Sequence, residues 1–246
     1  MSPVAVAGRN LTDRIDGVLW QSYAHLYDGL LDVHTYREML DRVGELADCD
    51  GRSVLDVGAG TGNVTRSLLR AGAATVTSVD ASRNMLGHAR RKLAPEVAEG
   101  RVRIVEGDAI AVMSDMPDSS VDRISAVNFL YVLPDRSEFF RQAERVLRPG
   151  GFVVASHTTR PGSGPIVRDQ YRRDGVRGVV RPRLLGIAAI DLLIDSLARG
   201  GRYDFAPVEA LAGEAAAAGL TRTTRLGRCY GGELDGVNEL LRIAAD

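Results

Sequence analysis

The residues that most clearly suggest chemistry lie in the segment Val-Leu-Asp-Val-Gly-Ala-Gly-Thr-Gly at residues 54–62. An apolar strand runs here into Gly58, Gly60 and Gly62, a pattern typical of the turn that holds a nucleotide between a strand and a helix. Asp56 stands two residues before Gly58, so we expect its carboxylate beside the loop. A negative charge there suits a ligand that carries an ammonium and a sulfonium group, and it suits a pyrophosphate badly.

The spacing of the glycines separates two classes of nucleoside ligand. In the dinucleotide fingerprint the third glycine follows the second by three residues, so that a helix N-terminus can face the pyrophosphate. Here Asn63 occupies that place, and the third glycine is Gly62. We therefore expect this loop, with Ala59 between its first two glycines, to bind S-adenosylmethionine rather than a dinucleotide.

The loop resembles motif I of the class I S-adenosylmethionine-dependent methyltransferases, and later motifs follow in the expected order over roughly residues 20–158. This resemblance implies an α/β fold with a Rossmann-like, seven-stranded, mostly parallel sheet, helices on both faces and an antiparallel last strand. It also implies S-adenosylmethionine as the cofactor. We expect no metal.

Asp80 is the next residue with a predicted role in cofactor binding. It ends the second predicted strand in the sequence Val-Asp-Ala-Ser, where its carboxylate could accept hydrogen bonds from both hydroxyls of a ribose, with Ala81 beside it. A helix N-cap for the segment that begins near Ser82 is the alternative role.

Two further residues are expected near the adenine. The resemblance implies that Asp108, which follows the third strand, receives the adenine amino group, while the backbone N–H of Ala109 meets the ring. Met85 lies one turn into the helix after Asp80, where its side chain could cover the adenine face. A methionine of the hydrophobic core would show the same pattern.

An aromatic segment precedes the sheet. Residues 20–28 resemble the Tyr-Ala-x-x-Tyr-Asp segment that closes over the cofactor in glycine and amino-sugar N-methyltransferases. Tyr23 and Tyr27 stand at i and i+4, so one helical face would present both phenols, and Trp20 would extend that face. We predict Tyr23 as a cofactor contact and Trp20 and Tyr27 as substrate contacts, with Tyr27 also a catalytic candidate. Packing of these rings onto the sheet is the alternative.

The acceptor is expected at the carboxyl ends of the fourth and fifth strands. Asn128 is predicted to contact the cofactor, and Tyr131 and His157 are predicted as substrate contacts and catalytic candidates. His157 is the best candidate for a base, because histidine titrates near neutrality. Its alternative role is a hydrogen bond to a loop carbonyl. A base is needed for a phenol or an alcohol and less so for a free amine.

The segment Asn128-Phe129-Leu130-Tyr131 shares its ends with the Asn-Pro-Pro-Tyr box of enzymes that methylate DNA adenine or protein glutamine. It lacks both prolines, which shape the rigid loop that clamps a planar amino group. Their absence argues against that substrate class.

We interpret the 246 residues, of which 45% are hydrophobic and 26% charged, as one domain. Its parts are an N-terminal helical cap (1–50), a cofactor-binding core (51–158), a lid inserted after the fifth strand (159–205) and a closing helix with strands (206–246). The predicted strands span residues 53–57, 75–79, 102–106, 121–127, 152–156, 220–230 and 237–243. The predicted helices span residues 12–31, 36–47, 63–71, 82–93, 136–147, 184–198 and 207–218.

The predicted lid is rich in arginine. Seven arginines stand against Asp169 and Asp174 in 24 residues, and we expect Arg160, Arg168 or Arg172 to bind a carboxylate or phosphate on the acceptor. A solvated connector is the alternative. The apolar face of the helix that follows could roof a pocket or form a homodimer contact.

Bulk properties exclude several classes of function. The formal net charge of −1 provides no general attraction for nucleic acid or an anionic membrane. Cys49 and Cys229 form no metal-ligand pair by spacing, and they read as reduced thiols of a cytoplasmic protein. Together with these exclusions, the resemblance to class I methyltransferases implies methyl transfer, which we expect to an O or N atom of a small molecule, a specialised metabolite. Peptide or protein N-methylation and a catalytically silent nucleoside-binding fold are the alternatives.

Overall fold

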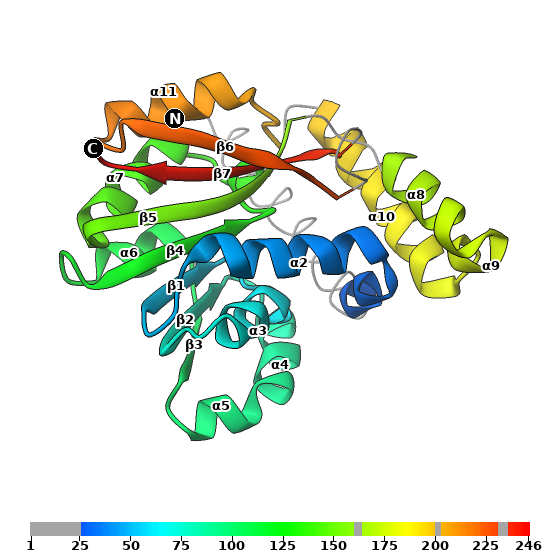
Figure 1. Cartoon of the computed structure of the whole chain (residues 1–246), viewed down its shortest axis with the longest axis horizontal. Helices are drawn as coiled ribbons and strands as arrows, with labels where there is room; N and C mark the ends of the chain where they lie inside the picture. Colours follow the sequence, from blue (N-terminus) through cyan, green and yellow to red (C-terminus); the bar gives the residue numbers. More distant parts are fainter. Residues whose placement is uncertain (1–25, 160–163, 200–202, 231–235) are drawn as a thin grey trace, which may run out of the picture.

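The computed structural model describes residues 26–159, 164–199, 203–230 and 236–246. Its centre is a seven-stranded sheet with the strand order β3-β2-β1-β4-β5-β7-β6 (Figure 1). The strands are β1 Ser53–Val57, β2 Thr75–Asp80, β3 Val102–Glu106, β4 Val121–Val127, β5 Leu147–Thr158, β6 Arg222–Cys229 and β7 Asn238–Ala244. β7 runs antiparallel to both of its neighbours, and the pairs among β1 to β5 are parallel. The expected fold class, with its antiparallel last strand, is confirmed.

Helices cover both faces of the sheet. The helical elements are η1 Asp28–Asp32, α2 His34–Ala47, α3 Asn63–Arg70, α4 Arg83–Lys92, α5 Ala94–Ala98, α6 Ala109–Ser114, η2 Leu130–Val132, α7 Arg136–Val146, α8 Gly164–Asp174, α9 Val176–Val179, α10 Pro182–Arg199 and α11 Val208–Ala217. Short polar side chains start several of them, because Ser82, Asp108 and Asp135 each accept a hydrogen bond from a backbone N–H in the first turn.

Two hydrophobic cores lie on opposite faces of the sheet. Phe152 and Val154 of β5 belong to the core beneath α2 and α3, while Val153 and Ala155 belong to the core beneath α7 and α11. This alternation follows from the two-residue period of a strand. It continues past the end of the apolar run, so that the next residue along β5, Ser156, points toward the α2 side.

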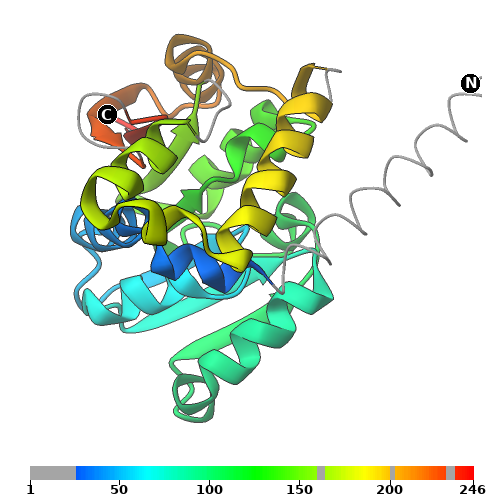
Figure 2. The same ribbon diagram turned by 90° about the vertical axis from the view of Figure 1, so that its right-hand side faces the viewer.

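The segment between β5 and α11 forms a helical insertion. Figures 1 and 2 show α8, α9 and α10 (yellow-green to yellow) together at one end of the molecule, beside the start of α2. The sequence predicted one helix here, over 184–198, and the structure extends it to Pro182–Arg199 and adds α8 and α9. Ion pairs to α2 and η1 attach this insertion, as described below. The composition alone does not show which residues form these pairs.

The structure also adds α5, α6 and η2, which the sequence did not predict. The remaining elements follow the predicted ranges closely, with two differences. β5 begins at Leu147, five residues before its predicted start. Most of the predicted helix 12–31 lies outside the described residues, and its last part forms the 3-10 helix η1. Within the described ranges, no helix is both long and apolar enough to cross a membrane.

Candidate functional site

The glycine loop between β1 and α3 depends on left-handed backbone conformations. Gly58, Gly60 and Gly62 have φ angles of 66°, 54° and 82°, a region that L residues with a side chain rarely adopt. A Cβ atom on Gly58 would lie 2.5 Å from Cδ2 of Phe129. A Cβ atom on Gly60 would instead meet only the loop's own Gly58 carbonyl, at 3.9 Å. The loop thus packs tightly against the residues after β4, and the described part of the chain leaves space next to Gly60.

Asp80 joins this loop to the end of β2. Its Oδ2 accepts from the backbone N–H of Gly60 at 2.8 Å, and its Oδ1 accepts from the N–H of Ser82 at 2.8 Å. Burial raises the pKa of the Asp80 carboxyl, and these two N–H groups counteract the rise. Each carboxylate oxygen retains a lone pair for a further donor. The carboxylate is therefore held in place by the backbone before any ligand arrives.

Asp56 occupies the interior instead of the loop surface. Its side chain is 1% exposed and accepts a hydrogen bond from Thr65 Oγ1 at 2.7 Å, and Thr65 is in turn 2.8 Å from Ser78 Oγ. Burial raises the pKa of Asp56 to about 7, with the hydrogen bond from Thr65 acting in the opposite direction. The carboxyl can therefore act on a ligand through its field, and direct contact is prevented by its burial.

The residues predicted near the adenine lie at the ends of β2 and β3. Asp108 is exposed and caps α6 by accepting from the N–H of Ala111 at 3.0 Å, while Ala109 is 6% exposed. Met85 is 3% exposed and packs in the core beneath α2 and α3, so its buried packing agrees with the alternative role. Ala81 is exposed at the start of the turn into α4.

Lys92 forms a polar cluster that the sequence did not predict. It is the only lysine in the sequence. Its Nζ donates to Asp28 Oδ1 at 2.7 Å, to Thr61 Oγ1 at 3.2 Å and, in a short contact, to Asn63 Oδ1. Three acceptors thus use the three N–H donors of one ammonium group. Burial lowers the pKa of Lys92, and the Asp28 carboxylate opposes that effect.

The cluster connects three elements around the glycine loop. Asp28 begins η1, Thr61 lies in the loop, and Lys92 ends α4. Thr61 Oγ1 also donates to Asp28 Oδ1 at 2.7 Å. The segment that follows the predicted aromatic cap is therefore fixed to the loop by charge-assisted hydrogen bonds.

The described aromatic residues of the cap region pack against one another. Trp20 and Tyr23 lie outside the described residues. Tyr27 packs edge-on against Tyr36 with ring centroids 6.2 Å apart, and Tyr36 lies 5.9 Å from Tyr230. Burial raises the pKa of Tyr36, whose hydroxyl accepts from Asn63 Nδ2 at 3.4 Å. The ring of Tyr27 therefore packs as the alternative role expects, and its contact with a substrate stays a prediction.

Tyr131 packs among aromatic rings, whereas His157 is buried against a loop carbonyl. Tyr131, in η2, packs on Tyr203 and Phe205 at centroid distances of 6.1 and 4.9 Å. His157 is 0% exposed, and its Nε2 lies 2.9 Å from the carbonyl oxygen of Ala206. Burial lowers the pKa of His157. Its contact with a loop carbonyl is the alternative role, and its burial on the α11 side separates it from the α2 side.

Asn128 lies at the carboxyl end of β4, close to the glycine loop. Its φ angle of 53° is left-handed, which asparagine tolerates better than most residues. The backbone N–H donates to the carbonyl of Ser156 at 2.9 Å, so the turn is fixed to β5. Its side-chain oxygen accepts hydrogen bonds from Ser156 and from Asn238 of β7.

The predicted acceptor-binding arginines belong to the insertion. Arg160 lies outside the described residues, and Arg168 and Arg172 are exposed on α8. Their neighbour Arg173 instead pairs with Glu38 of α2 and with Asp169. Arg181 lies 3.7 Å from Asp32. Part of the positive charge of the segment therefore attaches the insertion to α2 and η1.

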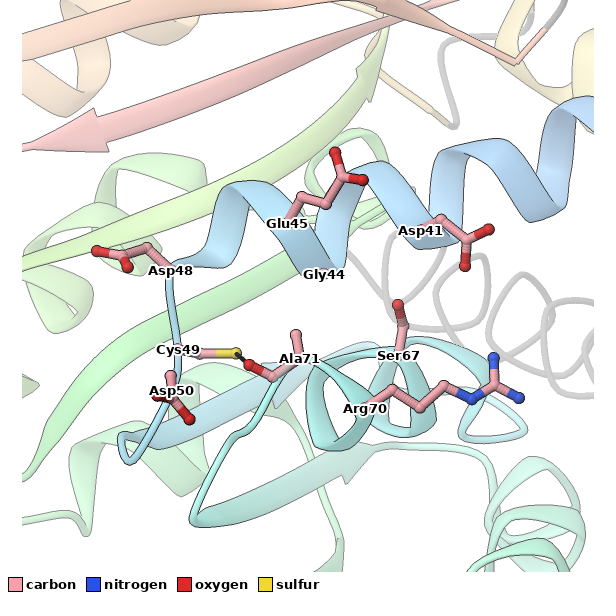
Figure 3. Close-up of a pocket in the computed structure, with 9 residues that line it drawn as sticks. All are labelled: Asp41, Gly44, Glu45, Asp48, Cys49, Asp50, Ser67, Arg70 and Ala71. Atoms are coloured by element: carbon pink, nitrogen blue, oxygen red, sulfur yellow. Dashed lines mark hydrogen bonds between the residues drawn. The ribbon is translucent and has the colours of Figure 1, made fainter.

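A separate groove lies between α2 and α3, at the opposite end of β1 from the glycine loop. It has a volume of about 450 Å³, and Figure 3 shows acidic side chains along it. Its lining residues are Asp41, Gly44, Glu45, Asp48, Cys49, Asp50, Ser67, Arg70 and Ala71. Cys49 is 1% exposed, and burial raises the pKa of its thiol. No group of three or more potential metal ligands occurs in the described part of the chain, including this groove.

Comparison with known proteins agrees with this geometry. A family model described as a methyltransferase domain matches residues 55–155. Methyltransferase GfsG of Streptomyces halstedii is 42% identical over 101 residues, which cover 41% of this chain and 36% of that protein. Demethylmenaquinone methyltransferase of Tropheryma whipplei is 38% identical over 132 residues, covering 54% of this chain and 51% of that protein. The matched region thus spans about a third to a half of these relatives.

A solved structure extends the likeness to the whole fold. A putative S-adenosyl-L-methionine-dependent methyltransferase of Methanococcus maripaludis superposes with a TM-score of 0.60 at 16% identity, covering 92% of this chain and 93% of that protein. The sheet, the glycine loop and these matches together define a class I methyltransferase fold. Residues 55–155 match the methyltransferase domain family, and the fold is that of the class I methyltransferases, whose cofactor is S-adenosylmethionine.

Proposed function

We propose that the protein transfers the methyl group of S-adenosylmethionine to an oxygen or nitrogen atom of a small molecule, a specialised metabolite. The observation that carries this proposal is the contact between the N–H of Gly60 and Oδ2 of Asp80. It sets a carboxylate beside the glycine loop, where the described residues leave space next to Gly60. A ribose can bind to such a carboxylate, and the glycines let the cofactor approach the loop backbone closely.

The order of the strands supports a proposed arrangement of the ligands along the site. We place the ribose hydroxyls at Asp80 and the adenine near Asp108 and Ala109, on the β2 and β3 side. The methionyl part then extends past the loop toward Asn128. The acceptor occupies the other side, over the ends of β4, β5 and β7, because that is where the remaining polar side chains of the carboxyl edge gather.

The bound cofactor supplies an electrophilic methyl group on a good leaving group. The protein's own task is to align an attacking lone pair with the S–CH₃ bond and to exclude water, and positioning of this kind contributes roughly 7 to 11 kcal/mol in well-oriented reactions. Because His157 is buried against Ala206, we give it no proton-transfer role. The acceptor then arrives in a form that needs no base from this histidine.

The insertion 159–205 is the proposed lid over the acceptor. Arg173 and Arg181 attach it to α2 and η1, and we propose the exposed Arg172, with Arg168 one turn before it on α8, as contacts for an anionic group. The name of the Tropheryma whipplei relative describes an enzyme that methylates demethylmenaquinone, a small molecule. This supports a small-molecule acceptor over a peptide. We propose the cytoplasm as the compartment, in keeping with two free cysteines.

The test is incubation with methyl-deuterated S-adenosylmethionine and a clarified cell extract. Small-molecule and macromolecular fractions are then analysed separately by mass spectrometry. We expect the label in the small-molecule fraction. Label confined to peptide or protein would replace the proposal with protein methylation, and no label despite binding of S-adenosylhomocysteine would favour a silent fold.

A further inference from the structure

A chain of hydrogen bonds on the acceptor side joins the carboxyl ends of β4 and β5 to the amino end of β7, which runs antiparallel to β5. Asn238 of β7 is 1% exposed and lies opposite Thr158 of β5 in the antiparallel register. Its Oδ1 accepts from Thr158 Oγ1 at 2.7 Å, and its Nδ2 donates to Ser156 Oγ at 2.7 Å and, in a short contact, to Oδ1 of Asn128. All hydrogen-bonding atoms of the Asn238 amide are therefore engaged.

The direction of these bonds is set by Ser156 and Met39. Ser156 is fully buried, and its Oγ lies 3.6 Å from Sδ of Met39, which can only accept a hydrogen bond. The hydroxyl also lies 3.3 Å from Oδ1 of Asn128. The thiol of Cys229 is a further hydrogen-bond partner of Ser156. With the hydroxyl proton directed at the sulfur of Met39, the 2.7 Å contact with Asn238 requires a donor on the asparagine. That donor is Nδ2, and the amide orientation of Asn238 follows.

The orientation of Asn238 in turn determines that of Asn128. Oδ1 of Asn128 receives Asn238 Nδ2 and Ser156 Oγ, so it faces the sheet. Its own Nδ2 has no hydrogen-bond acceptor among the described residues. The residue is half-buried beside the glycine loop, on the side of β5 and β7. Asn128 therefore presents two N–H donors, and no acceptor, to a molecule bound over the end of β4.

This polarity distinguishes an oxygen nucleophile from an amine. A neutral amine uses its one lone pair for the methyl group, and its N–H groups then need acceptors, which Asn128 does not offer. An anionic oxygen directs one lone pair at the methyl group and retains others that can accept from Nδ2. A hydrogen bond to such a charged oxygen is also the stronger kind.

We infer that the methyl acceptor is an oxyanion, such as a phenolate, an enolate or a carboxylate, oriented by the side-chain NH₂ of Asn128, with Asn238 as the residue that positions this amide. The acidic O–H loses its proton to solvent as the acceptor binds. An oxygen lone pair forms the O–CH₃ bond, while the S–CH₃ bond pair stays on sulfur and leaves neutral S-adenosylhomocysteine. This inference rests on the proposed function, which it narrows from O or N to O.

The amide orientation can be tested without an acceptor. Protein labelled with ¹⁵N-asparagine contains five asparagines, and hydrogen exchange of their side-chain NH₂ groups is measured by NMR in the complex with S-adenosylhomocysteine. We expect both Nδ2 protons of Asn238 to be protected and those of Asn128 to exchange faster by about tenfold or more. A protected Asn128 Nδ2 proton that bonds to Asn238 would overturn the inference.

The acceptor class is tested with the deuterated methyl group and the small-molecule fraction of an extract as the probe. We expect the label to be bound to oxygen. Asn128→Asp keeps the acceptor for Asn238 but turns a carboxylate oxygen toward the ligand, so we expect the rate of labelling at saturating S-adenosylmethionine to fall by about 100-fold. Asn84→Asp, at an exposed position on α4, is the matched control and should not change this rate.

Label on nitrogen or carbon, or faster labelling by Asn128→Asp, would overturn the oxyanion assignment while leaving methyl transfer itself intact. Absence of label in every fraction with wild-type protein would instead reject the proposed function and the acceptor class with it. The NMR measurement then still decides the amide orientation, so the two failures can be told apart.

Discussion

Nζ of Lys92 lies 2.7 Å from Oδ1 of Asp28, so one ion pair joins the last residue of α4 to the first residue of η1. The lysine side chain is 14% exposed and the aspartate side chain 37%. Because the same ammonium group reaches Thr61 in the glycine loop, the pair can transmit the position of the N-terminal segment to the cofactor site.

We predict that Lys92→Met lowers the affinity for S-adenosylhomocysteine about fivefold, which corresponds to the loss of roughly one net hydrogen bond, or about 1 kcal/mol. Lys92→Arg should lose nearly as much, because a planar guanidinium cannot direct three convergent donors at these acceptors. Titration calorimetry measures both, with Arg90→Met on the exposed face of α4 as the control. Wild-type affinity in Lys92→Arg would contradict the prediction.

Asp80→Ala should weaken binding of S-adenosylhomocysteine by about 100-fold, because it removes two charge-assisted hydrogen bonds to the ribose. Asp118→Ala is the control, since Asp118 is an exposed carboxylate in the loop before β4 that pairs with Arg145. Thermal unfolding of each variant shows whether the fold is retained. A folded Asp80→Ala protein with unchanged affinity would mean that the ribose lies elsewhere.

The raised pKa of Asp56, about 7, predicts how stability varies with pH. Between about pH 4 and pH 7 the native state holds a proton that the unfolded state has lost, so stability falls as pH rises and levels off above pH 7. Asp56→Asn removes this dependence. We expect its stability relative to wild type to be more favourable at pH 8 than at pH 5 by roughly 2 kcal/mol, as measured by urea unfolding.

The same carboxyl predicts a difference between two ligands. Once ionised, Asp56 should favour the sulfonium of S-adenosylmethionine, whose affinity then rises as pH passes 7, whereas uncharged sulfur in S-adenosylhomocysteine gives no such rise. Neither ligand should show the rise with Asp56→Asn. Identical pH profiles for the two ligands with wild-type protein would show that the charge of Asp56 does not reach the site.

His157→Gln should leave the pH profile of methyl transfer unchanged. The lowered pKa of His157 means that the native state binds fewer protons than the unfolded state below pH 6.5, so wild type loses stability as pH falls through that range. The glutamine variant should lack this loss. Methyl transfer slower by about 100-fold or more, as expected when a general base is removed, would restore the catalytic assignment.

Arg168→Ala and Arg172→Ala should raise the acceptor KM, by about tenfold for whichever side chain binds an anionic group. Arg173→Ala should leave the acceptor KM unchanged. It should lower the melting temperature by about 1 to 3 °C, because it breaks exposed ion pairs with Glu38 and Asp169. An unchanged KM in both α8 variants would mean that Arg168 and Arg172 do not bind the acceptor.

The sheet could be predicted from the sequence because its signals are local. The run Val54 to Val57 followed by three glycines specifies a strand and a turn within a few residues, and the same holds for the strand that ends at Asp80. The helices α8 and α9 could not be predicted in this way. Their segment is held by residues more than 130 positions away, as in the pair of Arg173 with Glu38.

The residues of the site also differ in how far local sequence predicts them. Asp80 and the glycines are marked by their spacing, and the structure brings them together. Asn238 carries no motif, and it becomes significant only because β7 pairs with β5 and places it opposite Thr158. His157 looked like a base because of its residue type, although the two-residue period of β5 turns it toward Ala206.

Because Lys92 is the only lysine in the sequence, the reactivity of its amine can report how often the glycine loop opens. Acylating reagents such as succinimide esters have one lysine side chain to modify, and that amine is occupied by three acceptors while the loop is closed. Its acylation rate should therefore report how often the loop, α4 and η1 separate. Mass spectrometry of the acylated protein over time, with and without cofactor, would measure this opening rate in a protein that carries no engineered probe. Spontaneous acetylation of this amine in a cell would, by the same geometry, weaken cofactor binding.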